Sequence, residues 1–175
     1  MPSRRSLAWI SLYGLLVAAV SCSTPDCLTL DAVGPISGAP ARESSRKALG
    51  FLEVKTKPTR ILDGAMPYYR NTPYTIQTLE GKPFKSVANH AGPTDQKPMV
   101  VRLPAGQYLV YAQSEGYGLV AVPVAIVPYQ LTQVNLRYEG LIDNPTHSET
   151  NWSRLPDGRI VGRRVSPTAD AANSN

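Results

Sequence analysis

The sequence predicts an all-β protein built on a single seven-stranded antiparallel sandwich. Short apolar runs recur at close, regular spacing, and turn residues separate them. The 175 residues include 16 prolines and 13 glycines, a composition that suits many turns. No ten-residue stretch has the apolar period of an amphipathic helix. A disordered N-terminal tether and a disordered C-terminal tail are expected to flank the sandwich.

The first strands follow from side-chain alternation and turn signals. Residues 51–55 alternate apolar and charged side chains, which is typical of a half-buried strand. Pro58, Asp63-Gly64 and Pro67 then indicate an irregular connection. Residues 74–79 and 84–88 form the second and third strands, and the turn at 80–83 makes them a hairpin.

Four further strands are expected at 99–103, 107–112, 119–127 and 131–137. In the second of these, Tyr108, Val110 and Ala112 fall on one face and should point to the core. Pro123 lies inside 119–127 and lacks an N–H group, so this strand is expected to be an edge strand or to carry a bulge.

The N-terminus has the pattern of a secretory signal peptide over residues 1–21. Arg4 and Arg5 precede an apolar run from 7 to 20, which at about 14 residues is short of the roughly 20 that span a bilayer. Small residues then lead to Cys22, and residues 19–22 resemble the lipobox of bacterial lipoproteins. That resemblance implies that the Cys22 thiol is acylated and becomes the mature N-terminus. The expected location is exported and lipid-anchored, on the periplasmic or cell-surface side of a bacterial membrane.

An ordinary signal peptide is the alternative, and it leaves open a disulfide between Cys22 and Cys27. Residues 22–48 are predicted to form a flexible tether that holds the domain off the membrane. The sandwich is assigned to 49–138. Residues 139–175 are predicted to be a largely disordered tail, in which Trp152 is expected to pin the first half to the domain.

Residues 103–112, Leu-Pro-Ala-Gly-Gln-Tyr-Leu-Val-Tyr-Ala, with Gly116-Tyr117 after them, resemble the core of carboxypeptidase-regulatory-like domains. The resemblance implies a prealbumin-like or immunoglobulin-like sandwich over about residues 50–137. Such domains usually have no catalytic residues and serve as scaffolds, spacers or binding modules. A shared fold does not by itself transfer an activity.

The sequence contains no recognisable catalytic, metal or cofactor motif. His90 lies in a predicted loop and His147 in the predicted tail, so solvated histidines are the favoured interpretation. The alternative function is a small metal-dependent enzyme that uses His90, His147 and nearby carboxylates or tyrosines.

The leading hypothesis is a non-enzymatic, membrane-anchored binding or scaffold module for an envelope protein or glycan. Tyr68, Tyr69, Arg70 and Tyr74 form the candidate binding surface, although packing at the sandwich rim would also explain them. Without Arg4 and Arg5 the net charge falls from +5 to about +3, and the chain is exported, so nucleic acid is not an expected partner. No oligomeric state is predicted.

Overall fold

The structure is a computed structural model that describes residues 27–36, 48–92, 94–138 and 151–165. These residues form strands and connecting segments and contain no α-helix, which confirms the all-β class. The signal peptide at 1–21 and Cys22 lie outside the described residues. No helix among the described residues is long and apolar enough to cross a membrane.

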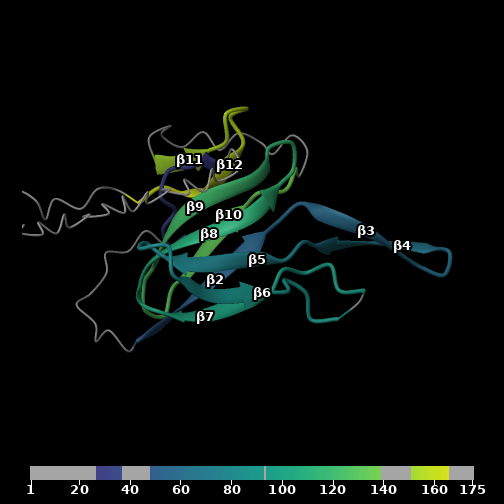
Figure 1. The fold of residues 1–175 in the computed structure, drawn as a ribbon, viewed down its shortest axis with the longest axis horizontal. Coiled ribbons are helices and arrows are strands. Elements are labelled where there is room, and N and C mark those ends of the chain that lie inside the picture. The colour runs from purple at the N-terminus through teal and green to yellow at the C-terminus, as the bar shows by residue number, and fades with distance from the viewer. Residues whose placement is uncertain (1–26, 37–47, 93, 139–150, 166–175) are drawn as a thin grey trace, which may run out of the picture.

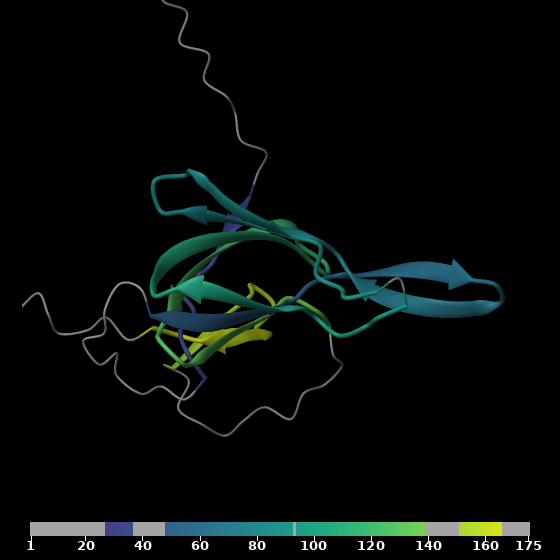
Figure 2. The ribbon, with the colours of Figure 1, turned by 90° about the horizontal axis from the view of Figure 1, so that it is seen from below.

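Two sheets face each other in an arrangement consistent with a β-sandwich (Figures 1 and 2). In spatial order, the five-stranded sheet contains β1 (Leu28–Thr29), β9 (Gly118–Ile126), β8 (Gly106–Ser114), β5 (Tyr74–Thr78) and β6 (Pro83–Val87). The three-stranded sheet contains β10 (Leu131–Asn135), β2 (Leu49–Lys55) and β7 (Val100–Pro104). Two separate hairpins are formed by β3 (Pro58–Asp63) with β4 (Met66–Asn71) and by β11 (Trp152–Arg154) with β12 (Ile160–Arg163).

Each of the seven predicted strands is present, and 74–88 is the predicted hairpin. The predicted antiparallel topology differs from the structure in two pairings. β1 runs parallel to β9, and β10 runs parallel to β2. Both sheets are therefore mixed, and the described residues form further strands outside the predicted seven.

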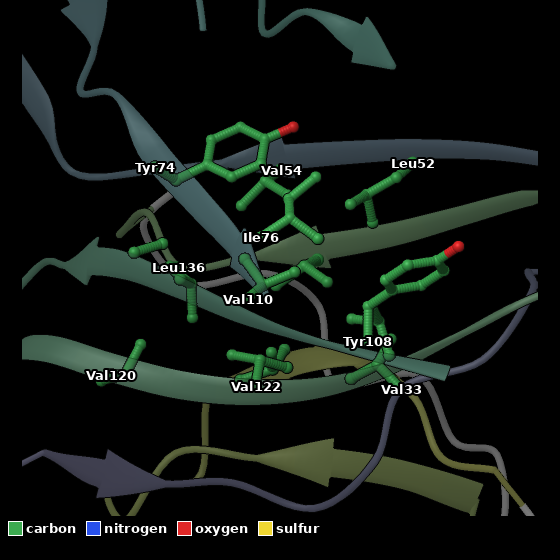
Figure 3. Packing of buried hydrophobic residues seen from close by; sticks show 14 of the residues in the cluster. Val33, Leu52, Val54, Tyr74, Ile76, Tyr108, Val110, Val120, Val122 and Leu136 are labelled. Atoms are coloured by element: carbon green, nitrogen blue, oxygen red, sulfur yellow. The ribbon is translucent and has the colours of Figure 1, made fainter. Parts of the chain in front are cut away.

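The core lies between the two sheets and consists mainly of valine, leucine and isoleucine (Figure 3). β8 shows how the sequence pattern builds it. Tyr108, Val110 and Ala112 are buried, as predicted, whereas Leu109 and Tyr111 on the opposite face are half-buried. The period of two residues along a strand gives this alternation.

The Pro104–Gly106 segment is a corner between the two sheets. β7 belongs to the three-stranded sheet and β8 to the five-stranded sheet, so these consecutive strands do not pair with each other. The Tyr108 hydroxyl donates a hydrogen bond to the Pro104 carbonyl at 3.1 Å, and its ring contacts Phe84 at a centroid distance of 5.0 Å. The tyrosine thus fastens the corner to the core.

The predicted flexible tether is wrong for residues 28–36, which are part of the fold. The Leu30 amide donates to the Ala121 carbonyl, and the Val33 amide donates to the Pro123 carbonyl at 2.8 Å. Val33 is fully buried, and the Ile36 amide donates to the Leu131 carbonyl of the other sheet. The segment therefore covers the edges of both sheets. Residues 22–26 and 37–47 of the predicted tether lie outside the described residues.

Pro123 explains how this segment runs along β9. The N-terminal segment bonds to Ala121, leaves the ladder at residues 31 and 32, and returns at Val33, which pairs with Val124. A proline has no N–H to donate, so an interruption of the ladder beside it leaves no N–H group of Pro123 unpaired. β9 is not an edge strand, because β1 and β8 lie on its two sides.

The predicted disorder of the C-terminal tail is wrong for residues 151–165. The Gly34 amide donates to the Arg163 carbonyl, and the Val165 amide donates to the Ala32 carbonyl. Leu155 and Val161 are buried in the core, and the sequence analysis did not identify them as core residues. Trp152, which was expected to pin the tail to the domain, is only half-buried. Arg164 forms an ion pair with Asp31. Residues 139–150 and 166–175 of the predicted tail lie outside the described residues.

Candidate functional site

The hairpin of β3 and β4, residues 58–71, projects from the sandwich and is called the arm below (Figures 1 and 2). The sequence analysis predicted an irregular connection here, and the structure corrects it. Asp63 pairs with Met66, which leaves Gly64 and Ala65 as a two-residue loop. Gly64 has a φ of 60° and Ala65 has no positive φ, as in a type II′ turn. The Asp63-Gly64 pair was therefore a hairpin signal.

The register of the arm separates the predicted binding residues. Residues directly opposite each other point to the same face of a hairpin. Tyr69 lies opposite Arg60 on one face, and Tyr68 lies opposite Ile61 on the other. Arg70 shares the face of Tyr68. The predicted cluster is therefore divided between two surfaces.

Tyr74 belongs to neither surface, because it is a core residue. Its side chain is 2% exposed and points between the sheets (Figure 3). Its hydroxyl has no hydrogen-bond partner among the described residues. Burial, with a smaller contribution from the charge of Glu53, raises the pKa of this hydroxyl far above its ordinary value of 10.0. The prediction of Tyr74 as a surface residue is wrong.

The arm exposes large apolar side chains, most of all near its turn. Leu62 is 62% exposed, Met66 is 65% exposed and Tyr69 is 46% exposed. Arg60 is also exposed. These side chains have no place in the core, and a two-stranded hairpin gains little stability by itself in water. Their exposure points to an interaction, because the fold does not need them there.

Buried amides hold the base of the arm. Asn89 is fully buried, and its Nδ2 donates to the carbonyls of Val54 at 3.0 Å and Thr72 at 3.2 Å and to the Thr56 hydroxyl at 3.1 Å. Its Oδ1 accepts a hydrogen bond from the Met99 amide at 3.1 Å. A single side chain thus connects β2, the two strand connections at the base of the arm and the loop before β7.

Asn71, at the end of β4, forms a second buried connection. Its Oδ1 accepts hydrogen bonds from the Thr56 amide and from the Arg137 guanidinium, both at 3.2 Å. Its Nδ2 donates to the Gln96 carbonyl at 2.9 Å. Buried polar groups that are hydrogen-bonded to several segments favour one geometry of those segments. The arm therefore leaves the sandwich in a fixed direction.

A shallow groove of about 380 Å³ lies beside the base of the arm, on the outer face of the five-stranded sheet. The Tyr111 ring, Leu119 and Pro73 supply its apolar surface, and Gln113 and Thr75 supply polar groups. Pro73 follows the arm by two residues. Tyr111, Gln113 and Leu119 are half-buried and Thr75 is exposed, so these side chains line an open surface. The sequence analysis did not identify a groove at this place.

The histidines give the metalloenzyme alternative no site among the described residues. His90 is half-buried, and its Nδ1 has no hydrogen-bond partner among these residues. Within residues 27–36, 48–92, 94–138 and 151–165, no three His, Cys, Asp or Glu side chains lie close enough together to hold a metal ion. His147 lies outside the described residues.

No protein-family model, curated protein or solved structure matches this chain. The resemblances to lipoproteins and to carboxypeptidase-regulatory-like domains thus rest on the residues quoted for them above.

Proposed function

We propose that the protein is a non-enzymatic, membrane-anchored envelope lipoprotein, acylated at Cys22, whose domain is a binding or scaffold module for an envelope protein or glycan. The finer form of this proposal is a prealbumin-like sandwich of the carboxypeptidase-regulatory-like type. The corner at Pro104–Gly106 and the inward-facing Tyr108 support that form, because they are the features on which the resemblance depends.

The observation that carries the binding role is the groove beside the rigid base of the arm. Tyr111 offers an aromatic face on which a sugar ring or an apolar side chain can pack. Gln113 and Thr75 offer hydrogen-bonding groups at the same place. A surface of this kind suits a glycan or an extended peptide, in which apolar and polar groups alternate over short distances.

Photocrosslinking in cells tests the binding role. A photoreactive amino acid replaces Gln113 in the groove, and the matched control carries it at Tyr129, which is 82% exposed and follows the opposite end of β9. We expect a protein adduct or a carbohydrate-containing adduct from position 113 alone. The binding proposal is wrong if position 113 gives no adduct, or if both positions give the same adducts.

Intact-mass analysis of the mature protein from its native membrane tests the anchor. We expect a diacylglyceryl or triacyl adduct that begins at Cys22, and we expect Cys22→Ser to move the protein to the soluble fraction. An unmodified N-terminus in the soluble fraction contradicts the anchor. Hydrolysis of an envelope substrate that one point mutation abolishes contradicts the non-enzymatic role.

A further inference from the structure

We infer that the arm enters, tip first, the anionic surface of the same bilayer that holds Cys22. The inference goes beyond the groove and its partner, but it rests on the proposed anchor. It assigns the exposed outer half of the arm to lipid. Three observations carry it, namely where the anchor segment joins the fold, how far the anchor and the arm reach, and the chemistry of the arm.

The anchor segment and the arm join the same end of the five-stranded sheet. Thr29 pairs with Ala121, Ala121 pairs with Tyr111, and Tyr111 pairs with Thr75, so these residues form one row across the sheet. β1 is parallel to β9, and β5 and β9 are both antiparallel to β8. β1 and β5 therefore start at the same end, and the chain before each of them enters there.

The distances allow the anchor and the arm to contact one bilayer together. Thr29 and Thr75 are three strand spacings apart, or roughly 14 Å. Residues 23–27 separate Cys22 from β1 and can span at most about 18 Å. The six residue pairs of the arm make it roughly 20 Å long. An acylated Cys22 therefore keeps this end of the sheet close to the headgroups, within reach of the arm.

The side chains of the arm match an anionic interface. Leu62 and Met66 lie beside the turn and are more than half exposed, and they point to opposite faces of the arm, so its tip is apolar on both sides. Tyr69 shares the face of Leu62. Arg60 and Arg70 lie nearer the sandwich, and Asp63 is the arm's acidic residue. Apolar tips enter the boundary of headgroups and acyl chains, tyrosines favour the interface, and arginines pair with lipid phosphates.

Depth-dependent quenching tests the inference on the full mature protein, acylated and reconstituted into vesicles of phosphatidylethanolamine and phosphatidylglycerol. Cys27→Ser removes the free thiol, and Leu62→Cys carries an environment-sensitive fluorophore. The matched control carries the fluorophore at Tyr129→Cys. Both positions are exposed, so neither label disturbs the core.

We expect quenchers attached to the acyl chains to reduce the emission at position 62 at least about threefold more than at position 129. Arg60→Glu with Arg70→Glu should lower the quenching at position 62, because both charges then repel the anionic lipid. Equal quenching at positions 62 and 129 in vesicles that float with the protein overturns the inference and leaves the anchor intact.

Two other results also overturn the inference. If the mature chain lacks the acyl group and does not float with the vesicles, the anchor proposal has failed, and nothing keeps the arm at the bilayer. If a photoreactive group at position 62 forms adducts with an envelope protein and lipid quenchers have no effect there, the arm binds a protein instead.

Discussion

Asn89→Ala is expected to destabilise the protein more than any exposed substitution, because Asn89 joins the arm to the sandwich. The substitution removes the hydrogen bonds to the Val54 and Thr72 carbonyls, to the Thr56 hydroxyl and from the Met99 amide. Each hydrogen bond contributes about 1 kcal/mol net, and buried groups left unpaired cost more.

The backbone at Asn89 adds a second contribution. Asn89 has a φ of 65°, in the left-handed region that asparagine and glycine tolerate better than alanine does. Together the two effects lower the free energy of unfolding by about 4 kcal/mol, a large part of the roughly 5–15 kcal/mol of a typical domain. Asn89→Gly keeps the backbone relaxed and should cost about 1 kcal/mol less.

Urea unfolding of the mature chain carrying Cys22→Ser measures both variants through the fluorescence of Trp152, the one tryptophan after residue 21. Hydrogen exchange should also show faster exchange throughout β3 and β4 in Asn89→Ala. The control is Asn151→Ala, because Asn151 is exposed, and its effect should stay within about 0.5 kcal/mol. A loss below about 1 kcal/mol for Asn89→Ala would refute the role given to the buried amide.

Three further predictions concern the core. Gly50→Ala should cost about 3 kcal/mol in thermal unfolding, because a Cβ there would lie 2.3 Å from the Val127 carbonyl oxygen; Gly92→Ala, with open space around it, is the control and should be nearly neutral. Val33→Asp should prevent folding, as judged by circular dichroism, whereas Ile36→Asp, at a site that is 51% exposed, should fold; equal behaviour contradicts the assignment of 28–36 to the fold. The raised pKa of Tyr74 means that only the unfolded chain ionises this hydroxyl just above its ordinary value of 10.0, so the wild type should lose stability as the pH rises from there toward the raised folded value. Tyr74→Phe should lack this pH-dependent loss of stability when the free energies of unfolding at about pH 8 and about pH 11 are compared. An equal loss in the wild type and in Tyr74→Phe would contradict the role given to the Tyr74 hydroxyl.

Local patterns predicted most of the sandwich because its strands carry their own signals. The alternation in β8 identified Tyr108 and Val110 as core residues, and Gly81 marked the turn of the β5–β6 hairpin. The parallel pairings could not be predicted in the same way. β10 lies beside β2 through contacts such as Leu131 with Phe51, which are far apart in the sequence and leave no local pattern.

The two terminal segments and the arm were predicted wrongly for other reasons. Residues 28–36 lie in a stretch rich in Ser, Pro, Ala and Gly, and residues 151–165 include four arginines, so composition favoured disorder. Val33 and Leu155 nevertheless fill the core once the two segments meet. At the arm, the sequence analysis interpreted Asp63-Gly64 together with the prolines at 58 and 67 as an irregular connection, although Asp63-Gly64 is the turn of a hairpin. Both prolines are tolerated because β3 and β4 pair only with each other, so each strand has an open edge.

The junction between the two terminal segments determines when a chain made from its N-terminus can finish folding. Val33 pairs with Arg164, so residues 28–36 cannot complete their contacts until residues 151–165 have been synthesised. Until then the edges of β9 and β10 stay uncovered, and such edges can pair with other chains. Closure over so long a loop is also slow. Loss of residues 160–165 would therefore leave these edges of β9 and β10 uncovered.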